Sequence, residues 1–133
     1  MTKISKGEEK IISILKKERI SFEREKQFPD MKKHGHKLRL DFFLENNIAL
    51  EFQGEQHYKF NSHFYKSNKD FKKRQEYDRY KIGYCLANKI KLYIIPFWEL
   101  DNIKESKDLF QNKFLARTQW KNDLDWKEYK KRG

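Results

Sequence analysis

Two alternating runs of side chains, separated by three residues, constrain the fold more than any other feature of this sequence. They occupy residues 38–44 (LRLDFFL) and 48–53 (IALEFQ), with 45–47 (ENN) between them. Alternation with a period of two is typical of half-buried β-strands, and a three-residue connection is typical of a hairpin. The sequence therefore predicts an antiparallel β-hairpin with one acid inside each strand, Asp41 and Glu51.

The register of this hairpin brings the two acids together. If Leu44 pairs with Ile48, the same register pairs Asp41 with Glu51 on one face. Opposite residues of neighbouring strands lie about 5 Å apart at Cβ, where like charges destabilise the pair. Two carboxylates suit Mg²⁺ or Mn²⁺ better than zinc, so the pair predicts a metal site. Alternatively, this face is exposed to solvent and Arg39 forms a surface ion pair with one acid.

The rest of the chain predicts helices and further strands around this hairpin. Ser5 and Glu8 fit a capping box at the start of a first helix. The expected order is a helix at about 5–19, an edge strand at 20–28, a polar loop at 29–37, the hairpin, a helix at 69–88, a strand at 91–95 and a helix at 102–114. This order predicts an α/β fold, a small single domain with a mixed central β-sheet flanked by helices. The domain would span residues 1–133, with a core at about 4–115 and a basic, aromatic tail at 116–133.

Composition narrows the choice of partners. The chain has 133 residues and a formal net charge of +11, which favours a polyanion such as DNA. A solvated, lysine-rich surface would give the same charge. The single cysteine excludes an internal disulfide and argues against a cysteine-based zinc site. The sequence lacks both a signal-peptide pattern and an apolar run of about 20 residues, which predicts a cytoplasmic protein with no membrane partner.

The basic residues gather in two stretches, 32–39 (KKHGHKLR) and 66–74 (KSNKDFKKR). The candidate DNA-binding residues are Lys32, Lys33, Lys37, Arg39, Lys72, Lys73 and Arg74. Contacts from such side chains to phosphates are sensitive to salt and carry no base-sequence information.

Several segments together resemble a known family. SKGE (5–8), LRLDFFL (38–44), IALEFQGEQHY (48–58) and EYDRYKIGYCLANKIKLYIIPF (76–97) resemble the very-short-patch-repair-like branch of the PD-(D/E)xK nuclease superfamily. The resemblance spans residues 4–96, and its most specific part is GEQHY directly after an apolar strand. Small nucleases of phages and of the homing type belong to this branch, so the resemblance also suggests a phage or mobile-element origin.

The resemblance implies a restriction-endonuclease-like fold and metal-dependent cleavage of phosphodiester bonds. The pattern of the branch, Glu, Asp, x, His, Asp, falls on Glu8, Asp41, His57 and Asp78. Glu51 and Gln53 occupy the two ends of the broader (D/E)xK step, where Gln53 replaces the usual lysine.

Asp41 and Glu51 are the candidate metal ligands of such an enzyme. A divalent ion held by carboxylates can activate water and neutralise the phosphate. His57 is the candidate for proton transfer, because imidazole gains and loses a proton near neutral pH. Glu8 would lie near the site at the start of the first helix, although the capping box explains this residue without any chemistry.

Asp78 and Lys81 lie three residues apart on the predicted second helix and therefore share a face. With Arg74 they form a stripe that could meet the two acids, and Lys81 could supply the positive charge that Gln53 lacks. The alternative is an ion pair between Asp78 and Lys81 on a solvated helix.

The leading interpretation is a Mg²⁺-dependent DNA endonuclease, resembling homing endonucleases, that nicks or cuts duplex or branched DNA. One alternative is a non-catalytic, basic nucleic-acid-binding module on a nuclease fold, which Gln53 favours. A Holliday-junction-type resolvase and an RNA-cleaving enzyme are also left open. Little chain lies beyond the catalytic domain, so targeting would come from substrate shape, a homodimer or a partner protein.

Overall fold

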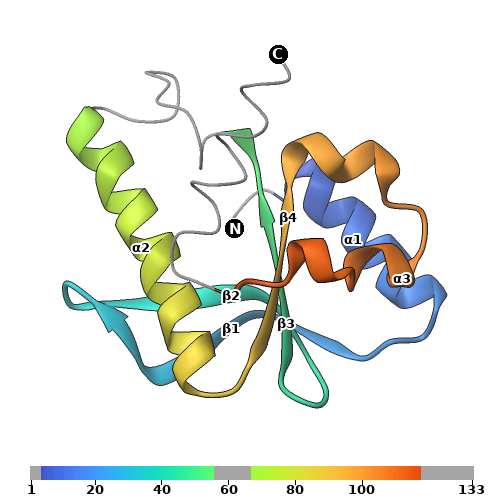
Figure 1. Ribbon diagram of the computed structural model, residues 1–133, viewed down its shortest axis with the longest axis horizontal. Helices are drawn as coiled ribbons and strands as arrows, with labels where there is room; N and C mark the ends of the chain where they lie inside the picture. Colours follow the sequence, from blue (N-terminus) through green and yellow to red (C-terminus); the bar gives the residue numbers. More distant parts are fainter. Residues whose placement is uncertain (1–3, 56–66, 118–133) are drawn as a thin grey trace.

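One four-stranded sheet with helices on both faces forms the centre of the molecule (Figure 1). The computed structural model describes residues 4–55 and 67–117. The strands, in their order across the sheet, are β1 (Phe22–Lys33), β2 (His36–Leu44), β3 (Ile48–Gln53) and β4 (Lys91–Pro96). The helical segments are α1 (Lys6–Lys17), α2 (Asn68–Ala87), η2 (Phe97–Asn102), α3 (Ser106–Leu109) and η3 (Asn112–Phe114). The predicted small single α/β domain is confirmed.

The sheet is mixed because β4 reaches it by a crossover. β1, β2 and β3 are antiparallel neighbours, whereas β4 runs parallel to β3. A parallel pair requires a long connection, and α2 lies within it. Figure 1 shows α2 on one side of the sheet and α1 on the other. Among the described residues, no helix is both long enough and apolar enough to cross a bilayer.

The central hairpin has the predicted register. Leu44 pairs with Ile48, and the pairing continues to Phe42 and Leu50. The connecting turn contains Asn46 and Asn47, both with φ near +60°. Asparagine tolerates this left-handed conformation better than most residues, which explains why a three-residue turn forms here.

The predicted polar loop at 29–37 is wrong. β1 continues through Pro29 to Lys33 and β2 begins at His36, so that only His34 and Gly35 form the turn. Proline is tolerated because β1 is an edge strand. Met31 lies in this stretch and is fully buried, so the segment contributes to the core despite its polar composition.

The predicted helix at 102–114 is also wrong. Two short helical segments, α3 and η3, lie in this region instead, and η2 ends at its first residue, Asn102. Asp108 accepts backbone hydrogen bonds from Lys104 and Glu105, and this capping box begins α3 at Ser106. The local cap thus starts a separate, short helix inside the stretch that was predicted as one helix.

The two faces of the sheet bury separate cores, and β2 contributes to both. Leu38 and Leu40 pack in the core on the α2 side, whereas Phe42 and Leu44 pack in the core on the α1 side. Regular alternation would place all four on one face. The change of face therefore occurs at Asp41.

The neighbouring strand is distorted at the same level. Its pairs with β2 pass from Arg24–Phe42 to Lys26–Leu40, on either side of Glu25. Glu25 has a φ of +52°, which is rare for a residue with a Cβ. This local irregularity accompanies the change of face in β2 and leaves Asp41 between the two cores.

Candidate active site

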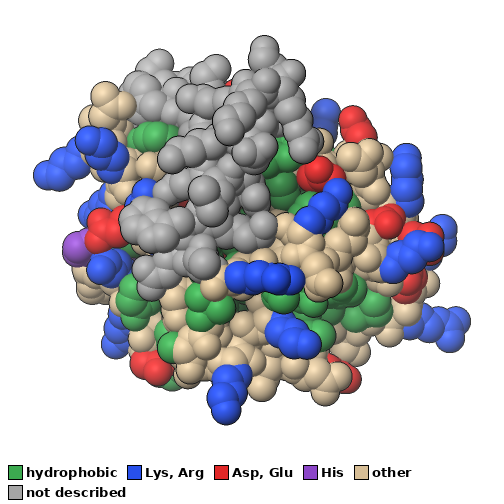
Figure 2. Space-filling model, viewed as in Figure 1, with side chains coloured by type: hydrophobic (Ala, Val, Ile, Leu, Met, Phe, Trp, Pro, Cys, Tyr) green, Lys and Arg blue, Asp and Glu red, His purple; other side chains and the backbone are tan. Residues whose placement is uncertain are grey.

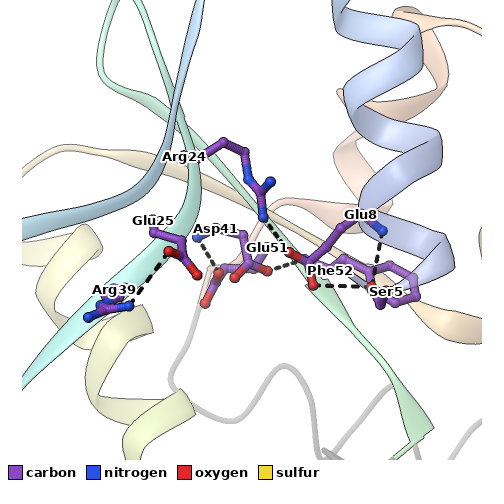
Figure 3. Close-up of polar contacts among 8 residues, drawn as sticks. All are labelled: Ser5, Glu8, Arg24, Glu25, Arg39, Asp41, Glu51 and Phe52. Carbon is purple, nitrogen blue, oxygen red and sulfur yellow. Dashed lines mark hydrogen bonds and ion pairs between the residues drawn. The ribbon is translucent and has the colours of Figure 1, made fainter. Parts of the chain in front are cut away.

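Asp41 and Glu51 lie side by side where β2 and β3 stop pairing. Beyond the last pair, Phe42–Leu50, the Asp41 N–H donates to Oε2 of Glu51 at 2.7 Å. The Phe52 N–H donates to Oδ2 of Asp41 at 2.9 Å (Figure 3). Each carboxylate thus accepts a backbone N–H of the neighbouring strand at the point where the ladder ends. The predicted proximity of the two acids is confirmed, but Asp41 and Glu51 do not form a pair of the β-ladder as predicted.

Lys81 reaches the same place from α2. Its Nζ donates to Oε1 of Glu51 at 2.6 Å and to the carbonyl oxygen of Arg39 at 3.1 Å. Glu51 is 3% exposed and Lys81 is 9% exposed, so the ion pair is buried. Burial acts to lower the pKa of Lys81, but the negative charges of Glu51, Asp78 and Asp41 outweigh it and raise that pKa above its ordinary value. Lys81 is therefore an ammonium ion at neutral pH.

The ionised form of Asp41 is disfavoured at this place in the fold. Burial raises the pKa of Asp41 well above its ordinary value, and the negative charge of Glu51 raises it further. The charge of Lys81 and the hydrogen bond from Phe52 act in the opposite direction without cancelling these effects. When both acids are ionised, the pair carries more negative charge than Lys81 alone neutralises.

A small cavity of about 140 Å³ opens beside this pair. It is lined by Ser5, Glu8, Asp41, Glu51, Phe52, Gly54, Arg74 and Lys81. These residues come from α1, β2, β3 and α2 and from the segment that follows β3. The fold therefore joins parts of the chain that lie far apart in sequence.

Glu8 is held at the rim of the cavity by two donors. Its Oε1 accepts from the Ser5 hydroxyl at 3.1 Å, and its Oε2 accepts from the Arg24 guanidinium at 2.6 Å (Figure 3). The Ser5 hydroxyl also accepts from the Glu8 N–H, as expected for an N-cap. Glu8 thus takes part in the N-terminal cap of α1 and also lies beside the two acids, so both predictions for this residue are met.

Gly7 allows α1 to come this close. A Cβ at this position would overlap the ring of Phe52. Glycine therefore lets the first turn of α1 pack directly on β3, which carries the neighbouring acid Glu51.

The remaining predicted catalytic residues are placed differently. Asp78 is buried on α2 and acts electrostatically on Lys81 without lining the cavity. Gln53 is buried at the end of β3, where it pairs with Pro96, and it does not line the cavity either. His57 lies in 56–66, outside the described residues.

The sequence alone did not identify Arg24 as part of this arrangement. Its guanidinium lies 5.0 Å from the centre of the Phe42 ring and bridges to Glu8. The sequence signal that could have identified Arg24 was its position in an alternating edge strand, two residues after Phe22 and so on the same face. Arg39, proposed as an alternative partner of the acids, instead lies 3.6 Å from Glu25.

The donor groups of the site limit which metal ion the candidate ligands could hold. In the described part of the chain, no group of three or more His, Cys, Asp or Glu side chains is arranged to hold a metal. Three carboxylates line the cavity, of which Glu8 is held by Ser5 and Arg24, which leaves two, the adjacent Asp41 and Glu51. This number fits Mg²⁺, which commonly binds one or two protein carboxylates together with water and substrate phosphates.

The predicted DNA-binding residues fall into three places. Lys32, Lys33 and Lys37 lie near the tip of the β1–β2 hairpin, and Arg39 follows on β2. Lys72 and Lys73 line a groove on α2, while Arg74 lines the acidic cavity.

Comparisons with known proteins found two viral relatives. A 65-residue stretch is 38% identical to "Uncharacterized protein 094L" of Frog virus 3 (isolate Goorha), covering 47% of this chain and 42% of the relative. A 50-residue stretch is 36% identical to "Uncharacterized protein 307L" of Invertebrate iridescent virus 6, covering 38% of this chain and 25% of the relative. The chain thus spans less than half the length of these curated relatives. No family model matches the chain, and no solved structure matches it.

Proposed function

We propose that this chain is a metal-dependent DNA endonuclease related to the very-short-patch-repair-like branch of the PD-(D/E)xK nucleases. The observation that carries the proposal is the meeting of Asp41, Glu51 and Lys81 beside one small cavity. Two adjacent carboxylates and a buried ammonium ion are the groups that phosphodiester hydrolysis needs.

A divalent ion fits the chemistry of this site. Burial and then the negative charge of Glu51 raise the pKa of Asp41, so an added positive charge would favour its ionised form. A bound Mg²⁺ or Mn²⁺ would neutralise phosphate charge and lower the pKa of a water molecule. Asp41 and Glu51 would hold the ion, with substrate and water completing its coordination.

The other residues around the cavity have roles that follow from their charge and position. Lys81 orients Glu51 through a 2.6 Å hydrogen bond. It provides the positive charge that the family pattern would take from a lysine at position 53, which is Gln53 in this chain. Arg74 lines the same cavity and is placed to contact a phosphate oxygen. His57 is proposed for proton transfer on the basis of the family resemblance alone.

One observation favours the second candidate, a non-catalytic nucleic-acid-binding module. Both oxygens of Glu51 already accept hydrogen bonds, one from the Asp41 N–H and one from Lys81. A site that is satisfied in this way could also be purely structural.

A nicking assay separates the two candidates. Supercoiled plasmid, a four-way junction and a matched RNA duplex would be incubated with Mg²⁺, Mn²⁺ or EDTA. The variants are Asp41→Asn and Asp101→Asn, because Asp101 is an exposed acid outside the cavity and gives the same chemical change. We expect metal-dependent cutting of DNA that Asp41→Asn abolishes and Asp101→Asn retains.

The other possible outcomes of the assay would support different functions. Binding of DNA without cutting in any metal would reject the nuclease and support the binding module. Preferential cutting of the four-way junction would identify a resolvase, and preferential cutting of the RNA duplex would replace DNA as the substrate.

A further inference from the structure

We propose that a groove between the tip of the β1–β2 hairpin and the N-terminal half of α2 is a second binding site, which holds the sugar–phosphate backbone of duplex DNA outside the acidic cavity. The identity of the ligand rests on the proposed function. The location of the site rests on the geometry and charge of the groove.

The groove is large and predominantly basic. It encloses about 630 Å³ and is lined by His34, Lys69, Lys72, Lys73 and Glu76. Figure 2 shows Lys and Arg side chains around an exposed histidine along the left edge of the molecule, the side on which Figure 1 places α2 and the hairpin tip. Three lysines facing one acid make an environment that attracts phosphate groups.

The hairpin tip is tied to α2 by Glu76, the one acid among the described residues that line the groove. Oε1 of Glu76 lies 2.9 Å from Nε2 of His34 and 3.5 Å from Nζ of Lys33. The hydrogen bond with His34 lowers the pKa of Glu76, so this carboxylate stays ionised. Glu76 thereby brings one basic segment of the sequence against the other.

An aromatic ring forms part of the same junction. The Tyr77 ring centre lies 6.1 Å from that of His34 and 6.5 Å from that of His36. Nζ of Lys73 lies 6.0 Å from the same ring centre. These contacts restrain side chains from both segments around Tyr77, which reduces the entropy lost when the groove binds a ligand.

The N-terminal part of α2 carries more bases than acids. Acids stabilise the positive N-terminal end of a helix and bases stabilise the C-terminal end. α1 follows this rule, with Glu8 and Glu9 in its first turn and bases in its last. α2 has one acid, Asp70, in its first turn, but it also carries lysines at 69, 72 and 73 near its N-terminus and no base in its last turn.

Lysines at the positive end of the helix dipole are unfavourable in the free protein. A bound anion would offset this effect, because it would meet both the lysines and the positive end of the helix. Departures from local rules of this kind are typical of binding sites.

The groove and the acidic cavity lie along the same helix. Lys73 lines the groove, whereas Lys81 lines the cavity. Arg74, the neighbour of Lys73, also lines the cavity, so the two sites lie on different faces of the same turns of α2. A duplex whose scissile phosphate occupies the cavity would therefore have flanking phosphates near the groove.

The test measures binding in the absence of cleavage. The protein would carry Asp41→Asn, and a fluorescein-labelled DNA duplex would report binding by anisotropy over a range of salt concentrations in EDTA. The groove variant is Lys72→Gln with Lys73→Gln. The control is Lys16→Gln with Lys17→Gln, an equal charge change at exposed positions in the last turn of α1.

We expect the groove variant to raise the Kd for the DNA duplex roughly tenfold or more at 0.1 M salt. The slope of log K against log salt concentration should become shallower by about 2, because each lost phosphate contact contributes about 0.9. The control should change Kd much less. Equal effects of the two variants would overturn the proposal. The cleavage assay of the parent and the binding assay of the groove variant give separate answers. If the parent cuts no substrate but the groove variant loses binding, the groove is supported and the nuclease is rejected. If the parent cuts DNA but the groove variant binds normally, the nuclease is supported and the groove is rejected.

Discussion

At the residue scale, Asp41 links stability to pH. Burial and the charge of Glu51 raise the pKa of Asp41 above its unfolded value of 3.8. The stabilisation from protonated Asp41 is therefore complete below the unfolded pKa and is lost as pH rises through the folded pKa. Asn at this position keeps an acceptor for the Phe52 N–H and removes the charge.

We expect Asp41→Asn to be more stable than the parent at neutral pH in EDTA, by about 1 kcal/mol or about 4 °C in Tm. The difference should shrink as the pH falls towards the unfolded pKa, because Asp41 then becomes neutral in the parent as well. Thermal unfolding followed by circular dichroism across this range measures both effects. A lower Tm for the variant at neutral pH would contradict the charge-repulsion argument.

Lys81 is the residue whose loss should be most costly. Lys81→Met would leave Glu51 buried beside Asp41 without its 2.6 Å ion pair. Removing one partner of a buried ion pair costs about 3–5 kcal/mol. We expect a loss of this size in urea unfolding, and the double variant Lys81→Met, Glu51→Gln should lose less than the two single losses combined. Additive losses would show that the two side chains are not coupled.

At the scale of elements, the start of α1 serves both folding and the site. Ser5 caps α1 and donates to Glu8, whereas Ser67 caps α2 and does not line the cavity. Ser5→Ala and Ser67→Ala should each cost about 1 kcal/mol of stability. Only Ser5→Ala should also reduce the proposed DNA cleavage, because it frees one oxygen of Glu8. Equal activity of the two variants, measured at a temperature where both are folded, would remove Glu8 from the mechanism.

At the scale of the whole molecule, metal binding should stabilise the entire domain. An ion that binds only the folded state at a hundred times its Kd adds about 2.7 kcal/mol to the free energy of unfolding. We expect Mn²⁺ to raise the Tm of the parent by several degrees and to leave that of Asp41→Asn unchanged, as measured by differential scanning fluorimetry. An equal rise in both proteins would place the ion elsewhere.

Much of the fold and part of the site could be predicted from the sequence because their signals are local. The period of two and the three-residue turn determined the hairpin and its register, and with them the meeting of Asp41 and Glu51. The Ser5 cap determined where α1 begins. Caps, turns and periodicity act within a few residues, so a single sequence contains them in full.

Only the tertiary structure decided which distant groups meet. Lys81 bonds to Glu51 across 30 positions of sequence, and His34 meets Glu76 across 42. The hairpin tip was predicted as a loop, because its polar composition hides a buried Met31. Which face of a helix meets which strand depends on how the two cores pack against the twisted sheet, and no local pattern specifies that packing. The sequence by itself therefore determined the acid pair, while the fold supplied its cation and joined the two basic segments.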